Sequence, residues 1–152
     1  MRMRKTLAAG LVTVASAAAM TVAPAAHAGY PFPLQCQYTN STDSWTFNGG
    51  FGTAPGETIC VNNYELAMQS DGNLVIYNNI ATPIWSSGTW NHSGATAKFQ
   101  PDGNFVIYGY GGSPALWASN TYGNSGATLV FQQDGNLVIY GPGHQPLWNT
   151  GT

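Results

Sequence analysis

One ten-residue phrase occurs three times in the sequence, as MQSDGNLVIY, FQPDGNFVIY and FQQDGNLVIY. Its glutamines, Gln69, Gln100 and Gln132, recur at intervals of 31 and 32 residues. Each copy is followed by a second phrase around a tryptophan, which reads PIWSSGT, ALWASNT or PLWNTGT. Two phrases that recur in step predict three copies of one supersecondary unit, packed around a shared core.

Each repeat has the composition of strands joined by turns. Val, Ile, Tyr, Phe and Thr are abundant, Gly and Asn interrupt them every few residues, and no long amphipathic helical pattern follows the N-terminal segment. Within a unit we expect a strand ending near the glutamine, a tight turn at Asp-Gly-Asn, a strand through LVIY and another through the tryptophan. The segment 45–68 should supply the strands that complete the three units. The predicted fold class is all-β.

The N-terminal segment has the pattern of an export signal. Residues 1–28 combine a basic start, an alanine-rich apolar stretch and an Ala-His-Ala cleavage pattern. A membrane anchor is the alternative, but no stop-transfer charges follow the apolar stretch, and no other segment is apolar enough to span a bilayer. We therefore expect a secreted, extracellular protein, and the alanine content indicates a bacterial exporter. Residues 29–44 then form an N-terminal extension, and residues 45–152 form a single domain.

The charge that remains after the export signal excludes several kinds of partner. Lys98 is the one lysine or arginine left, against six carboxylates, which gives a net charge near −5. This balance argues against nucleic acids and other polyanions. The chain also has no basic amphipathic face for a membrane surface, so membrane insertion is not expected.

The two cysteines, Cys36 and Cys60, predict a disulfide that ties the extension to the domain, because an even pair in an exported chain is usually oxidised. A catalytic or metal-binding pair is the alternative. Only His92 and His144 could assist it after removal of the signal, and neither has a metal-ligand spacing. No metal site and no cofactor are predicted.

The repeated phrase contains a row of polar side chains with a period of two, as expected for one face of a strand. In the third copy these residues are Gln132, Asp134, Asn136, Val138 and Tyr140. A carboxylate accepts hydrogen bonds, and amides and phenols both donate and accept, which suits the hydroxyls of an uncharged sugar. A phosphate site would need Lys, Arg or a helix start, and a calcium site would need more oxygens. The row predicts a site for a neutral polyol.

A purely architectural interpretation covers part of the phrase. Asp-Gly turns are ordinary hairpin turns, but they do not explain Gln and Tyr at fixed offsets. For the tryptophans that recur in each unit the architectural interpretation is preferred, because one large aromatic residue per repeat suits a core around a central axis. These are Trp85, Trp117 and Trp148. Trp45 and Trp90 lie outside this register and are left unassigned.

The phrase Gln-x-Asp-x-Asn-x-Val-x-Tyr, followed by the tryptophan phrase, resembles the bulb-type mannose-binding lectins over about residues 45–152. The resemblance implies a β-prism II fold, in which three antiparallel four-stranded sheets surround a pseudo-threefold axis with tryptophans near the centre. It also implies that Asp and Asn bind the axial 2-hydroxyl of mannose, that Gln reaches the 3-hydroxyl and Tyr the 4-hydroxyl, and that Val packs on the ring. The matching positions are Gln69, Asp71, Asn73, Val75 and Tyr77 in the first site, Gln100, Asp102, Asn104, Val106 and Tyr108 in the second, and Gln132, Asp134, Asn136, Val138 and Tyr140 in the third.

The function implied by the resemblance is that of a secreted lectin, which recognises mannose or mannose-containing glycans through three metal-independent sites. We do not expect an enzyme, because glycoside hydrolysis needs two carboxylates flanking the bond and each repeat has one Asp. A lectin-like antibacterial toxin of the same fold is the alternative function. Such toxins resemble tandem domains, whereas this chain has one.

Two features depart from the family pattern. Gly72 stands in the turn where plant members commonly have a disulfide cysteine. Pro101 lacks a backbone N–H, which predicts a locally unpaired or edge strand at the second site. Members of the family often dimerise by exchanging the C-terminal strand, and such a homodimer is left open for this chain.

Overall fold

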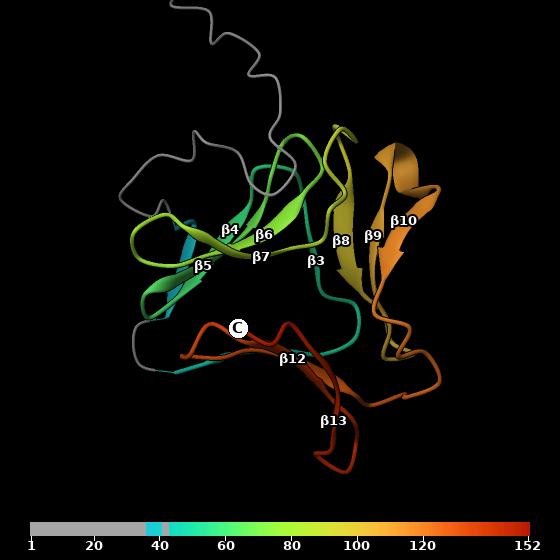
Figure 1. The fold of residues 1–152 in the computed structure, drawn as a ribbon. Coiled ribbons are helices and arrows are strands. Elements are labelled where there is room, and N and C mark those ends of the chain that lie inside the picture. Colours follow the sequence, from blue (N-terminus) through green and yellow to red (C-terminus); the bar gives the residue numbers. More distant parts are fainter. Residues whose placement is uncertain (1–35, 41–42) are drawn as a thin grey trace, which may run out of the picture.

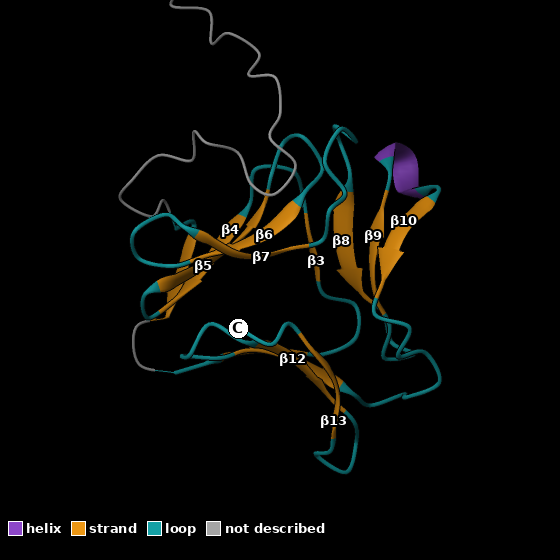
Figure 2. Cartoon of the chain, in the orientation of Figure 1, coloured by secondary structure: helices purple, strands orange, loops and turns teal. Residues whose placement is uncertain are grey.

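The computed structural model describes residues 36–40 and 43–152, and these form short strands joined by turns (Figure 2). The predicted export signal, residues 1–28, lies outside the described residues, as does the extension as far as residue 35. Within the described ranges the helical element is a three-residue 3₁₀ turn, η1 (Tyr110–Gly112). The all-β prediction is confirmed.

Each repeat contributes three consecutive antiparallel strands. They are β5 (Tyr64–Met68), β6 (Leu74–Tyr77) and β7 (Pro83–Ser86) in the first repeat, β8 (Thr96–Phe99), β9 (Phe105–Tyr108) and β10 (Ala115–Ala118) in the second, and β11 (Thr128–Phe131), β12 (Leu137–Tyr140) and β13 (Pro146–Asn149) in the third. The middle strand is the LVIY or FVIY segment, and the last strand carries the tryptophan. Both agree with the sequence prediction.

The fourth strand of each sheet comes from upstream of the repeats. These strands are β2 (Trp45–Phe47), β3 (Gly52–Thr53) and β4 (Thr58–Val61). They are used in reverse order, since β4 pairs with β5, β3 pairs with β8 and β2 pairs with β11. The expectation that the segment 45–68 completes the sheets is confirmed.

The three sheets stand around a common centre like the sides of a prism (Figure 1). One core cluster takes apolar residues from the inner faces of all three sheets. Equivalent positions of the repeats show the symmetry, because Ile76, Ile107 and Ile139 pair with the three tryptophans and are all 0% exposed. This arrangement is the predicted β-prism II.

The tryptophans of the three repeats meet edge to face and tie the sheets together. Ring centroids lie 5.9 Å apart for Trp85 and Trp117, 5.9 Å for Trp85 and Trp148, and 5.3 Å for Trp117 and Trp148. These separations and the steep angles between the rings are favourable for aromatic pairs. The three residues therefore belong to the centre of the prism, as the sequence predicted.

The first sheet differs from the other two in having a fifth strand. The predicted disulfide joins Cys36 to Cys60 on β4. Just after Cys36, β1 (Tyr38–Asn40) pairs in parallel with β4. The expectation of four strands in every sheet is thus corrected for the first sheet, because the disulfide holds this part of the extension against the open edge of β4.

Replacement of Trp117 by alanine should destabilise the domain by about 3–5 kcal/mol, because the change removes its aromatic contacts with Trp85, Phe105 and Trp148 and leaves a cavity. Chemical denaturation followed by circular dichroism measures the change. Tyr122, which is 68% exposed, supplies the control, and Tyr122→Ala should alter the free energy of unfolding by no more than about 0.5 kcal/mol. A loss of under about 1 kcal/mol for Trp117→Ala would contradict a central role.

Candidate functional site

Each polar row is built on a β-hairpin whose turn has the same hydrogen bonds in all three repeats. The backbone N–H of Gln69 donates to the carbonyl of Asn73 at 2.9 Å, and the N–H of Gly72 donates to the carbonyl of Gln69 at 3.0 Å. Gly72 has a φ of 96°, a conformation that glycine adopts without strain. The glutamine and the asparagine thus face each other across a hairpin, which agrees with the tight turn expected at Asp-Gly-Asn.

The turn also accommodates Pro101. This residue lies in the turn beyond β8, at the position of Ser70 in the first repeat, where its fixed φ is suitable and no N–H is needed for the ladder. The N–H of Gln100 still donates to the carbonyl of Asn104 at 2.8 Å. The loss of strand pairing expected at the second site is therefore wrong.

The aspartate of each row holds the turn with one carboxylate oxygen. Oδ1 of Asp71, Asp102 and Asp134 accepts the backbone N–H of the asparagine two residues later, at 3.0 Å in each repeat. The side chains of Asp102 and Asp134 are exposed. A carboxylate has two oxygens, so Oδ2 of these two residues is available to accept a hydrogen bond from a ligand hydroxyl.

The asparagine side chain is oriented by the strand that carries the tryptophan. Oδ1 of Asn104 accepts hydrogen bonds from Ser119 Oγ and from the backbone N–H of Thr121, both at 3.2 Å. A backbone N–H can only donate, so the accepting atom must be the amide oxygen, and Nδ2 is left as the donor of the row. Asn73 is held in the same way by Ser87 and Thr89, and Asn136 by the hydroxyl of Thr150 and the backbone N–H of Gly151.

The residues that orient Asn104 also close the hairpin with their hydroxyl groups. Ser119 Oγ accepts the N–H of Phe105 at 3.0 Å, and Thr121 Oγ1 donates to the carbonyl of Gly103 at 2.7 Å. These residues were not identified from the sequence, although the signal was present. A hydroxyl residue stands two and four positions after each tryptophan, and these are Ser87, Thr89, Ser119, Thr121, Thr150 and Thr152.

The glutamine and the tyrosine of each row bond to each other across the hairpin. The Nε2 group of the glutamine donates to the tyrosine hydroxyl at 2.8 Å in the first row and at 2.9 Å in the second and third. In the second and third rows both residues are partly exposed. The glutamine carbonyl can accept and the tyrosine hydroxyl can donate to a ligand there. This bond accounts for the fixed offset between the two residues, which the turn alone does not require.

The valine of each row lies on the outer face of its sheet. Val106 and Val138 are 2% and 3% exposed and lie between the polar ends of their rows. In the first sheet Val75 packs with Ala67 and Tyr77 in a cluster separate from the core. The structure therefore brings all fifteen predicted site residues into three outward-facing rows, one on each sheet.

The first row is closed to solvent, whereas the second and third are open. Gln69 is 3% exposed, and Asn73 and Tyr77 are each 1% exposed. Their counterparts in the other two rows are all partly exposed. The three rows thus have the same residues in different surroundings, and no feature of the repeated phrase predicts this difference.

The first row also contains an ionisable group that the others lack. Glu65 pairs with Tyr77 across β5 and β6, is 0% exposed, and neither of its carboxylate oxygens has a hydrogen-bond partner. Burial raises the pKa of Glu65 to about 7. Burial likewise raises the pKa of Tyr77 to about 12, against the opposing effect of the hydrogen bond from Gln69, so Tyr77 remains a neutral phenol.

A metal centre has no ligand set in the described part of the chain, because residues 36–40 and 43–152 contain no group of three His, Cys, Asp or Glu side chains placed to hold an ion. Nor does any helix among the described residues reach the length and apolarity that a membrane span requires.

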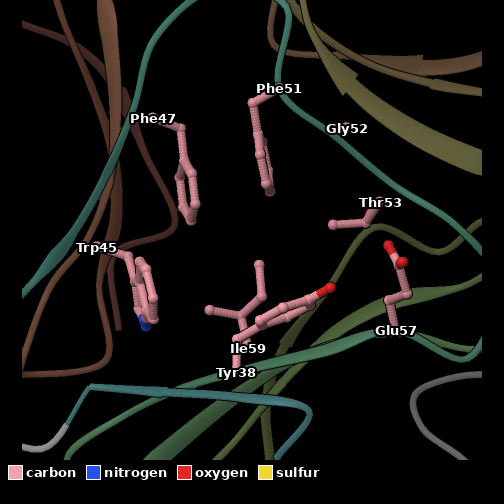
Figure 3. Close-up of a pocket in the computed structure, with 8 residues that line it drawn as sticks. All are labelled: Tyr38, Trp45, Phe47, Phe51, Gly52, Thr53, Glu57 and Ile59. Atoms are coloured by element: carbon pink, nitrogen blue, oxygen red, sulfur yellow. The ribbon is translucent and has the colours of Figure 1, made fainter.

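A separate cavity of about 250 Å³ opens between β2, β3 and β4 (Figure 3). Four of its eight lining residues are aromatic, and the rings of Phe47 and Phe51 stack with centroids 3.8 Å apart. The indole N–H of Trp45 donates to the carbonyl of Cys60 at 2.9 Å. Trp45, left unassigned from the sequence, therefore joins the third sheet to the first, and the cavity has none of the row residues in its wall.

A three-sided prism with a row of sugar-compatible donors and acceptors on each outer face defines a class of carbohydrate-binding proteins. No protein-family model matches the chain. Crystal structures of monomeric monocot mannose-binding lectins from Gastrodia elata are similar to it, with 39% identity over 73% of this chain and 98% of theirs and a TM-score of 0.64. The snowdrop (Galanthus nivalis) mannose-specific agglutinin is 34% identical over 73% of this chain and 97% of its own, with a TM-score of 0.58.

The similarity extends to a curated sequence and to a fungal protein. A mannose-specific lectin from Dendrobium findlayanum is 46% identical over 55 residues, which are 36% of this chain and 32% of that protein, so the match spans about a third of this relative. A lectin from Marasmius oreades is 27% identical over 76% of this chain and 95% of its own, with a TM-score of 0.63. The chain belongs to the bulb-type mannose-binding lectin family. Its relatives are lectins, which bind carbohydrates and are not enzymes, in agreement with the sequence prediction.

Replacement of Glu65 by glutamine should remove a pH dependence from the stability of the domain. The carboxyl group of Glu65 loses its proton near the ordinary glutamate pKa of 4.5 in the unfolded chain and near 7 in the folded one. Between these values the folded state keeps a proton that the unfolded state has released, so the free energy of unfolding falls as the pH rises. The fall should reach between about 1 and 3 kcal/mol and level off above pH 7.

Urea denaturation of the wild type and of Glu65→Gln from pH 4 to pH 8 measures this difference. The two curves of stability against pH should diverge through the window, with the variant more stable at the upper end. Parallel curves would show that Glu65 titrates alike in the folded and unfolded chain.

Proposed function

We propose that this protein is a secreted lectin that binds mannose or mannose-containing glycans through metal-independent sites. The observation that carries the proposal is the matching set of hydrogen bonds that orients the Gln, Asp, Asn and Tyr side chains in the open second and third rows. The relatives support it, since the snowdrop agglutinin structure contains methyl-α-D-mannoside and the Polygonatum cyrtonema lectin, 33% identical, was crystallised with a monomannoside.

Each group of the second row would bind a sugar hydroxyl through the atom that the fold leaves available. Asp102 Oδ2 accepts and Asn104 Nδ2 donates, which together serve a 2-hydroxyl. Gln100 Oε1 accepts from a 3-hydroxyl, and the Tyr108 hydroxyl donates to a 4-hydroxyl. Val106 packs against the C–H groups of the ring. The third row repeats this set with Gln132, Asp134, Asn136, Val138 and Tyr140.

Binding at one row should be weak. Each neutral hydrogen bond contributes about 0.5–1.5 kcal/mol net, and association entropy offsets part of the sum. We expect a dissociation constant of around 1 mM for a single mannoside, near −4 kcal/mol. Useful affinity would come from a branched or polymeric glycan that meets several rows.

Three sites per chain are proposed, and they are not equally accessible. The first row has the full residue set, but binding there requires exposure of Gln69, Asn73 and Tyr77, which are buried. The second and third rows are the sites expected to bind sugar in the form described.

Secretion, quaternary structure and origin are further parts of the proposal. Secretion depends on residues 1–28 acting as an export signal. In the structure β13 pairs with β12 of its own chain, so a homodimer by C-terminal strand exchange requires that this pairing be broken. Size-exclusion chromatography of the mature protein distinguishes monomer from dimer. A bacterial origin depends on the alanine-rich signal alone, since the relatives compared above come from plants and a fungus.

The double variant Asp102→Ala/Asp134→Ala should lose retention on mannose-agarose, because it removes the carboxylate from both open rows. Asp71→Ala, made in the closed row, is the matched control and should be retained like the wild type. Circular dichroism confirms that all three proteins are folded. Retention of the double variant would overturn the assignment of the rows as sites.

Treatment with a chelator should leave retention on mannose-agarose unchanged, because the rows bind through amide, carboxylate and phenol groups alone. The measurement compares elution volumes of the wild type with and without EDTA. Loss of retention in EDTA that calcium restores would contradict the metal-independent mechanism.

A further inference from the structure

The three rows have the same five residues, but the neighbouring strand presents a different side chain beside each. The residue paired with the row's valine is Ala67 in the first sheet, Lys98 in the second and Val130 in the third. Residues paired directly across two strands project from the same face. Each row therefore has its own neighbour on the outer face, and among the three the second row has the basic one.

The ammonium group of Lys98 lies at the second row. Its Nζ is 5.9 Å from the centroid of the Tyr108 ring, within the range of a cation–π contact. On its other side Lys98 pairs with Gly52 of β3, which has no side chain to cover it, and Lys98 is exposed. The ammonium thus lies near the tyrosine end of the row, while Asp102 lies in the turn at the opposite end.

This ammonium is the one lysine or arginine charge in residues 36–40 and 43–152, which also contain six carboxylates. An anion is therefore repelled by most of the surface and attracted at one place, and that place adjoins one of three otherwise equivalent rows. An ammonium group has three donors and no acceptor, so its natural partner is an anionic oxygen. A polyanion remains excluded, but a single anionic substituent on a bound sugar is not.

We propose that the second row prefers mannose that carries a phosphate group and that Lys98 is the residue that sets this preference. The inference rests on the proposed function, because the row itself must first hold the mannose ring. The neutral groups of the row bind the ring, and the ammonium of Lys98 donates to the phosphate oxygens. The first row has Ala67 and the buried acid Glu65 in its place, and the third has Val130, so neither offers a cation.

A protein with only the second row intact tests the preference. Asp71→Ala/Asp134→Ala supplies it, and titration calorimetry measures the affinities of methyl α-mannoside, mannose 6-phosphate and mannose 1-phosphate. One or both phosphates should bind about two- to five-fold more tightly than the methyl mannoside at low salt, as expected for one exposed ion pair. The ratio should fall towards one in 0.5 M NaCl, where charges are screened over a few ångströms. The two phosphates distinguish which side of the sugar faces Lys98.

Two exchanges between the second and third rows provide matched variants. Lys98→Val in the second-row protein should bring the ratio of affinities to one. Val130→Lys with Thr46→Gly, made in Asp71→Ala/Asp102→Ala, should transfer the preference to the third row. Thr46 is included because it pairs with Val130 where Gly52 pairs with Lys98. A ratio of one in the second-row protein at low salt, a ratio that survives Lys98→Val, or no transfer to the third row would overturn the proposal.

The outcomes separate this inference from the proposed function. Binding of methyl α-mannoside without any preference for phosphate refutes the role of Lys98 alone. Failure of the unmodified chain to bind methyl α-mannoside and to be retained on mannose-agarose refutes the proposed function itself.

Discussion

The hydrogen bonds to the asparagine carbonyl are the interactions on which both the fold and the rows depend. In the second repeat Asn104 accepts from Ser119 and from the backbone of Thr121, which follow the central Trp117 by two and four positions. The same bonds fix the hairpin tip, orient the amide of the row and hold the tryptophan strand in register. Packing at the centre and recognition at the surface are therefore maintained by one set of contacts, and this explains why the two repeated phrases occur in step.

Much of this architecture could be predicted from the sequence because it is periodic. The repeat identified three units, the turn residues located the hairpins, and the recurring Trp85, Trp117 and Trp148 pointed to a central axis. The bond between glutamine and tyrosine left a signal in their fixed offset, but the atoms that meet across the hairpin are evident only in the structure. The hydroxyl residues after each tryptophan were visible too, but a strand surface tolerates many polar residues, and their role is evident only when the partner asparagine is in place.

What could not be predicted depends on how the strands are paired and on what surrounds each repeat. The position of Lys98 beside the second row follows from the register of β8 against β9 and from Gly52 on β3, and the phrase itself records neither. The burial of the first row and of Glu65 is likewise a property of surroundings rather than of the repeated residues. Three copies of one phrase therefore yield three chemically distinct surfaces. A repeat conveys what the units share, and the adjoining strands determine how they differ.

The reverse order in which β4, β3 and β2 join the repeats has a consequence for how the chain reaches this state. The first sheet closes between neighbouring segments, the second spans a wider loop, and the third joins the strand that begins at Trp45 to the strands that run from Thr128 to Asn149. During synthesis β2 cannot pair with β11 until the residues from Thr128 to Phe131 have been made. Non-local pairing of this kind slows folding, because a long loop must close before any contact compensates its entropy. The first and last strands of the prism, β2 and β13, thus join the same sheet in one late step of folding. Removal of either strand would open the same side of the prism.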